Sequence, residues 1–208
     1  MLLNPAFEHC PDEALIIARI LGGYGELEML LAMCLANVLG DSRKALRVLF
    51  RTRGESARIN TADALMAADY ADAGLKAEYA DALGAIRQSL KIRNSLAHSH
   101  WADLDLTPYE GIKGYNPIKG LFHVALGEAA LHAENFEYKW MHTEISLLKA
   151  MESYCGYARH TLMYVQWEWS VRKGGRQYNA IPIPKKQQPP NQRIVEDPDI
   201  LRWLPKSP

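Results

Sequence analysis

The sequence has no long uninterrupted apolar run, although 48% of its 208 residues are hydrophobic. No stretch approaches the roughly 18 apolar residues that a membrane-spanning helix needs. Residues 1–10 also lack the basic segment followed by an apolar segment that marks a secretion signal. We therefore expect neither membrane insertion nor export, and we expect a cytoplasmic protein with enough apolar residues for a substantial core.

The chain has only three cysteines and carries no net charge. Cys10, Cys34 and Cys155 show no spacing typical of a zinc site, so we expect reduced thiols, no bound metal and no cofactor. Basic and acidic residues balance at 24 each, which gives a net charge of zero. This balance argues against a broad electrostatic footprint for duplex nucleic acid, although it is compatible with a small basic cleft.

Apolar residues recur at steps of three and four along much of the chain, which predicts a mainly all-α protein. Asp41 or Ser42 can cap the second of the expected helices. Gly22, Gly23 and Gly25 interrupt the first, and there we favour the close approach of another helix over a kink. The predicted helices cover residues 11–40, 42–50, 55–67, 75–97 and 143–173.

The helical periodicity stops after Trp101, where residues typical of turns predict an irregular loop. Two segments with strand character follow, at residues 120–126 and 135–141, and the second alternates aromatic with charged side chains. We interpret the pair as a β-hairpin. Together with the loop it forms an insertion at about residues 102–142.

Seven of the eleven prolines fall within residues 173–208, so this segment is expected to be an extended tail. The rest of the chain has no internal repeat and no low-complexity tract. The predicted organisation is therefore a helical domain at residues 1–172 that contains the insertion, followed by the proline-rich tail. The helical domain is expected to be a bundle of four or five helices.

The predicted helix over residues 75–97 carries a charged residue in its apolar stripe. At roughly 100° per residue, Arg93 projects almost in line with Leu75. An unpaired buried guanidinium is strongly unfavourable, so an anion, a carboxylate or a second subunit is expected near it. Glu26 and Glu28 are the available carboxylates for a structural ion pair. The stripe consists of Leu75, Tyr79, Ala82, Leu83, Ile86, Leu90 and Ala97.

The pattern Arg93-Asn94-x-x-x-His98, at the end of a long helix in an all-α protein of this size, resembles the signature of the HEPN superfamily. Trp101, three residues after His98, is an aromatic residue of the kind that usually follows that signature. His100 satisfies the longer spacing that the family tolerates and is held in reserve. The resemblance extends over about residues 12–172 and implies a HEPN-like helical bundle.

Many HEPN proteins are metal-independent endoribonucleases that act as homodimers, with two motifs facing each other across a cleft. The resemblance therefore implies RNA as the substrate and a site at a twofold interface. A neutral imidazole at His98 would take the proton from a ribose 2′-hydroxyl, and Arg93 would bind the phosphate, giving a 2′,3′-cyclic phosphate. Asn94, one turn before His98, would orient the imidazole. The family is common in toxin–antitoxin and phage-defence systems, so an antitoxin or another protein partner is also implied.

Helix geometry complicates a site built from one helix, because positions five apart diverge by roughly 140°. Either the helix ends at Ala97 and His98 swings round, or Arg93 of one subunit meets His98 of the other. Two other functions are compatible with the sequence. One is a non-catalytic binding or scaffolding module in which Arg93 forms a structural ion pair, and the other is a nucleotide-binding pocket within the bundle.

The last predicted helix and the tail contain further candidates for contact with RNA. The basic pairs Arg172-Lys173 and Lys185-Lys186 could bind phosphate, but a solvated linker explains them equally well. An aromatic stripe on the same helix could stack bases, although such stripes usually belong to a core or an interface. Its members are Tyr154, Tyr157, Tyr164 and Trp167.

Overall fold

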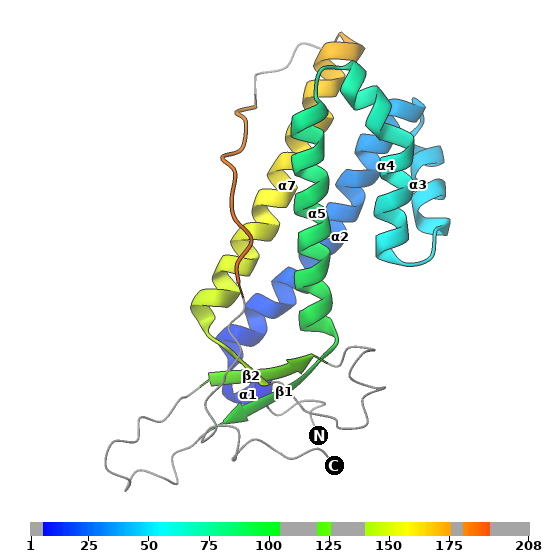
Figure 1. Ribbon diagram of the computed structural model, residues 1–208. Coiled ribbons are helices and arrows are strands. Elements are labelled where there is room, and N and C mark those ends of the chain that lie inside the picture. The colour runs from blue at the N-terminus through cyan, green and yellow to red at the C-terminus, as the bar shows by residue number, and fades with distance from the viewer. Residues whose placement is uncertain (1–5, 105–119, 126–139, 176–180, 192–208) are drawn as a thin grey trace, which may run out of the picture. The chain divides into compact units, whose positions relative to one another are not determined.

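The computed structural model of the chain is mainly helical (Figure 1). It describes residues 6–104, 120–125, 140–175 and 181–191. The chain divides into two compact units. The helical unit comprises Ile20–Arg93 and Met151–Pro189, and the sheet unit comprises Met1–Arg19, Asn94–Ala150 and Pro190–Pro208.

Most of the described residues belong to helices. The long helices match the predicted segments closely, although the predicted helix over 55–67 continues five residues further. None of the helices in the described ranges is long and apolar enough to cross a membrane. The helices are α1 (Ala6–His9), α2 (Pro11–Leu39), α3 (Ser42–Arg51), α4 (Glu55–Asp72), α5 (Lys76–Ala97) and α7 (Ile145–Gly174).

The glycines of α2 do not mark a close helix contact. Gly22, Gly23 and Gly25 are exposed, and a Cβ added to any of them would meet no atom within 4 Å. The prediction that another helix approaches there is therefore wrong, because this side of α2 faces open space. The helix is anchored through other positions in the same stretch, where Tyr24 and Leu27 are buried.

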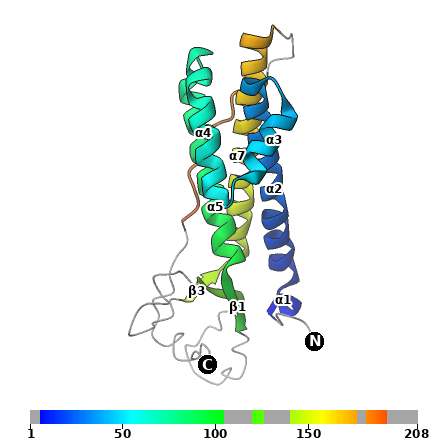
Figure 2. The ribbon, with the colours of Figure 1, turned by 90° about the vertical axis from the view of Figure 1, so that its right-hand side faces the viewer.

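In the helical unit, α2, α4, α5 and α7 pack as a bundle, and Figures 1 and 2 show these helices running lengthwise alongside one another. The amide of Asn37 on α2 donates to the carbonyl of Gln166 on α7 at 2.8 Å. The hydroxyl of Tyr70 on α4 donates to the carbonyl of Cys34 at 3.3 Å, and the Tyr70 ring stacks on that of Tyr79 on α5. The fully buried apolar core of this unit includes Leu27, Leu31, Leu35, Ile59, Met66 and Ile86.

The turn from α4 to α5 depends on Gly74, whose φ of 71° is a conformation that favours glycine. The Leu75 amide donates to the Tyr70 carbonyl at 2.9 Å, which closes the end of α4. Arg172 of α7 then donates to the carbonyls of Ala73 and Gly74, at 3.1 and 2.8 Å. Arg172, a candidate for RNA contact by sequence, thus holds this turn in place.

The starts of α3 and α4 are set by local sequence. The Asp41 carboxylate accepts from the amides of Arg43 and Lys44 at 2.9 and 3.2 Å, so Asp41 rather than the neighbouring serine caps α3. Gly54, with φ of 83°, precedes α4 and makes the sharp entry into that helix. Glu55 is consequently the first residue of α4, where its negative charge is favourable.

The sheet unit contains an antiparallel sheet of three strands in the order β1-β2-β3. β1 (Ser99–Leu104) pairs with β2 (Gly120–Ala125), and β2 pairs with β3 (Trp140–Thr143). Leu121 and Thr143 are aligned across β2 and β3, and both are buried.

β1 was not predicted, because an irregular loop was expected directly after Trp101, whereas the strand runs to Leu104. Its six residues do not alternate strictly between polar and apolar, so they lack the usual signal of a half-buried strand. Of the strand predicted over residues 135–141, only the last two residues are described, and they belong to β3. In the tail, residues 181–191 form neither helix nor strand, and the remainder of residues 176–208 lies outside the described ranges.

Candidate functional site at the end of helix α5

Arg93 lies in the second-last turn of α5 and faces the start of α4. Its Nη1 atom is 3.7 Å from Oε1 of Glu55, and its side chain is 28% exposed. The sequence analysis placed Arg93 in the middle of a buried face, but the structure leaves it half-buried. The guanidinium therefore has a carboxylate neighbour and retains access to solvent.

A second ion pair lies in the same region of the helical unit. Nη1 of Arg58 donates to Oε1 of Glu28 at 2.7 Å, and Nε of Arg58 donates to the Thr52 carbonyl at 3.1 Å. The Arg58 guanidinium also lies 5.3 Å from the centre of the Phe50 ring, within the range of a cation–π contact. These three contacts hold the Arg58 side chain in place.

Tyr24 on α2 lies close enough to both ion pairs for their charges to affect the pKa of its hydroxyl. Its ring is buried, and no described residue hydrogen-bonds its hydroxyl. Burial raises the pKa of the Tyr24 hydroxyl above its ordinary value, and the negative charges of Glu28 and Glu55 raise it further. The positive charges of Arg93 and Arg58 act in the opposite direction. We call these five residues the Arg93 cluster.

The carboxylates proposed from the sequence as partners of Arg93 are placed differently. Glu26 is exposed on α2, and Glu28 forms its 2.7 Å pair with Arg58. The structure places the carboxylate of Glu55, which was not considered from the sequence, 3.7 Å from Arg93. No local pattern links residues 55 and 93, because their proximity arises from the packing of α4 against α5.

Asn94 and His98 follow directly along α5, in the sheet unit. The His98 amide donates to the Asn94 carbonyl at 3.0 Å, so helical hydrogen bonding continues one residue beyond Ala97. His98 is exposed, and Asn94 is half-buried. Because they are four positions apart on the helix, Asn94 and His98 lie on the same helical face. The division between the two units falls between Arg93 and Asn94.

The backbone beyond His98 is anchored to the same helix end. Nε1 of Trp101 donates to the Leu96 carbonyl at 3.3 Å, and the hydroxyl of Ser99 donates to the Ser95 carbonyl. The Trp101 ring also packs on Phe7 of α1, with ring centres 5.7 Å apart. Trp101 thereby fixes the chain as it leaves α5 and enters β1.

The reserve residue His100 lies in β1, paired in register with Val124, and its side chain is outside the described ranges. The predicted apolar stripe of α5 is buried from Leu75 to Leu90. At its end, however, Ala97 is exposed and Leu96 is buried instead. The stripe therefore shifts by one position in the last turn of the helix.

The aromatic stripe of α7 is mostly interior. Tyr154, Tyr157 and Tyr164 are buried, and Trp167 is 38% exposed. Among the residues that the structure describes, no three His, Cys, Asp or Glu side chains lie together in a group able to hold a metal ion. Cys34 is fully buried, and burial raises the pKa of its thiol to about 12.

No protein-family model, curated protein or solved structure matches this chain. The functional argument therefore depends on the residues themselves. Sequence reasoning identified Arg93 as a misplaced charge, but it missed Tyr24, Glu55 and Arg58. The only local signal for Glu55 was its position as an acidic residue at a helix start, which by itself indicates favourable helix electrostatics.

Proposed function

We propose that this protein is a metal-independent endoribonuclease of HEPN type. The observation that carries the proposal is the state of Arg93, which is half-buried, open to solvent and held at 3.7 Å by Glu55. An arginine in this state can exchange a carboxylate for a phosphate, since its planar guanidinium binds either anion. The exposed His98 in the next turn supplies a group capable of proton transfer.

In the proposed reaction, neutral His98 removes the proton from a ribose 2′-hydroxyl. The 2′-oxygen then forms a bond to the adjacent phosphorus as the bond to the 5′-oxygen breaks, and the departing oxygen takes a proton. The products are a 2′,3′-cyclic phosphate and a 5′-hydroxyl. Arg93 stabilises the negative charge on the phosphate, and Asn94 orients the imidazole as a positioning residue.

The proposal includes a HEPN-like fold and a cytoplasmic homodimer with the site at the twofold interface. The bundle of α2, α4, α5 and α7, with the motif at the end of α5, supports the first part. The divergence of positions five apart on a helix supports the second, because residues from two subunits could converge. A toxin–antitoxin or phage-defence role with a protein partner completes the proposal.

The decisive experiment incubates end-labelled RNAs of diverse sequence with the purified chain in EDTA. We expect cleavage that leaves 2′,3′-cyclic phosphate ends, and we expect Arg93→Ala and His98→Ala each to reduce the rate at least about 100-fold. Arg87→Ala and His160→Ala are matched controls, since Arg87 is an ion-paired arginine of α5 and His160 is an exposed histidine of α7. Cleavage that is unaffected by the motif variants would refute the proposal.

Asn94→Ala tests the positioning role separately. We expect a smaller loss of kcat than for His98→Ala with little change in KM, because the imidazole is still present but is no longer held in one orientation. Light scattering tests the dimer. A chain that remains monomeric at micromolar concentration while cleaving RNA would refute the shared site but leave the nuclease intact.

A second candidate is a non-catalytic binding or scaffolding module, and the Arg93–Glu55 pair favours it. In this case the cation in the apolar stripe is neutralised within the fold and needs no phosphate. The module predicts no RNA cleavage and a marked loss of stability for Arg93→Ala. The nuclease predicts RNA cleavage and no marked loss of stability for Arg93→Ala.

A further inference from the structure

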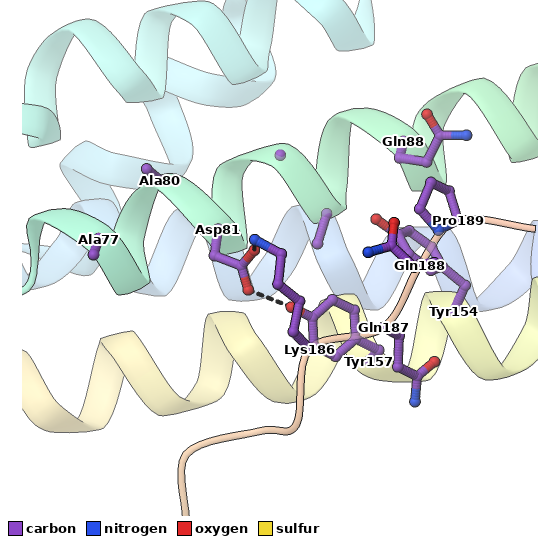
Figure 3. Close-up of a pocket in the computed structure, with 12 residues that line it drawn as sticks. Ala77, Ala80, Asp81, Gln88, Tyr154, Tyr157, Lys186, Gln187, Gln188 and Pro189 are labelled. Atoms are coloured by element: carbon purple, nitrogen blue, oxygen red, sulfur yellow. Dashed lines mark hydrogen bonds and ion pairs between the residues drawn. The ribbon is translucent and has the colours of Figure 1, made fainter.

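A groove of about 470 Å³ lies in the helical unit between α5, α7 and the tail segment, which we define as residues 181–191 (Figure 3). Small residues of α5, among them Gly84, leave room along that helix. Tyr154 and Tyr157 of α7 form the other wall, with ring centres 5.7 Å apart. Part of the tail segment, from Lys186 to Pro189, lines the third side.

One carboxylate connects all three sides of the groove. Nζ of Lys186 is 2.9 Å from Oδ1 of Asp81, and the Tyr157 hydroxyl donates to Oδ2 of the same carboxylate. Although burial opposes it, the bonds from Tyr157 and Lys186 hold the pKa of Asp81 below its ordinary value. The carboxylate is therefore ionised at neutral pH and presents a negative charge to a lysine.

The shape of the groove suits an extended, proline-containing peptide. Such peptides bind between aromatic side chains because their preformed polyproline II conformation loses little entropy on binding. The four consecutive residues from Lys186 to Pro189 all line the groove. Figure 3 shows Lys186 reaching toward Asp81 and Pro189 lying near Gln88.

The tail segment is held lightly. The side chain of Lys186 is 72% exposed in its ion pair, and Ile183 is 68% exposed although it is apolar. Exposed ion pairs contribute little to stability. The segment can therefore leave the helices without unfolding them, because fully buried core residues such as Leu27, Leu31 and Ile86 do not line the groove. Its departure would expose the buried rings of Tyr154 and Tyr157.

We propose that the face of α5 and α7 against which the tail segment lies is a peptide-binding site for the Lys-Gln-Gln-Pro sequence, and that it exchanges the chain's own tail segment for the same segment of a second copy. The charge of Asp81, which pairs with Lys186, and the aromatic wall of Tyr154 and Tyr157 provide its specificity. This site does not include Arg93 or His98, so it is independent of the proposed nuclease activity.

Binding in trans is tested with a fluorescent peptide of residues 181–191 and the full-length Lys186→Glu chain, in which the two negative charges expel the chain's own segment. Fluorescence anisotropy should show binding to this variant at least about fivefold tighter than to the wild-type chain, where the resident segment competes. Adding Asp81→Asn should weaken binding by about two- to fivefold.

Asp63→Asn is the matched control for Asp81→Asn. Asp63 also accepts from a tyrosine hydroxyl, that of Tyr79, and pairs with a cation, Arg87, and its exposure is similar at 31% against 30%. Asp63 lies on α4 and does not line the groove. Equal effects of Asp81→Asn and Asp63→Asn, or no peptide binding to Lys186→Glu, would overturn the proposal.

Limited trypsin cleavage provides a second readout that needs no added peptide. Cleavage after Lys185 and Lys186 should be about two- to fivefold faster in Asp81→Asn than in the wild-type chain or in Asp63→Asn. The double variant Asp81→Lys with Lys186→Asp restores opposite charges and should return cleavage at Lys185 toward the wild-type rate. Identical cleavage rates for the wild-type, Asp81→Asn and Asp63→Asn chains would also overturn the proposal.

Discussion

A double-mutant cycle on Arg93 and Glu55 separates the two proposed functions. The cycle measures the free energy of unfolding of the wild-type chain, Arg93→Gln, Glu55→Gln and the double variant. Its coupling energy reports how much the pair itself stabilises the fold. A structural ion pair gives a large coupling, whereas a phosphate-binding arginine with a loosely held counterion gives a small one.

The expected magnitude follows from distance and exposure. At 3.7 Å and the dielectric constant of water, two unit charges attract by about 1 kcal/mol. The side chains are 28% and 34% exposed, so solvent screening and the ordering of both side chains reduce this value. We expect a coupling of about 0.2–1 kcal/mol.

The Arg58–Glu28 pair is the internal standard. Its atoms are 2.7 Å apart, its side chains are 24% and 18% exposed, and Arg58 is fixed by further contacts. The same cycle with Arg58→Gln and Glu28→Gln should therefore give a larger coupling, about 1–3 kcal/mol. Urea unfolding followed by circular dichroism at pH 7 is a suitable assay. A coupling for Arg93 and Glu55 above about 2 kcal/mol, or above the standard, would refute the reasoning.

Three other predictions concern buried groups. Tyr24→Phe removes a hydroxyl that no described residue hydrogen-bonds, so the free energy of unfolding should stay unchanged or rise by about 1 kcal/mol. A decrease of about 1 kcal/mol in urea unfolding would contradict this prediction. The Cys34 thiol should react with a disulfide reagent only after unfolding, because it is buried and its pKa is raised to about 12; reaction in the folded chain at pH 8 would show that it is accessible. Tyrosines whose pKa is raised by burial contribute stability that is fully present below pH 10 and is lost as pH rises further, so the melting temperature should fall above about pH 10. A melting temperature that stays constant through pH 12 would contradict this last prediction. These tyrosines are Tyr24, Tyr70, Tyr79, Tyr154, Tyr157 and Tyr164.

Local sequence determined the helices, because apolar periodicity, caps and breakers act over a few residues. Asp41 caps α3, and Gly74 allows the turn after α4, for reasons visible in neighbouring positions. Local sequence also identified Arg93 as unusual, since a charged side chain in an apolar stripe requires a partner. It failed at the glycines of α2, because the same composition suits either an open face or a close contact.

Only the tertiary structure decided which groups meet. Glu55 is 38 positions from Arg93 along the chain, and Lys186 is 105 positions from Asp81, yet each pair lies within 4 Å. Periodicity specifies the face on which a side chain lies but not which helix or segment packs against that face. Consequently, local patterning predicts that Arg93 needs an anion nearby. The packing of α4 on α5 decided that this anion is Glu55, and the course of the tail placed Lys186 on Asp81.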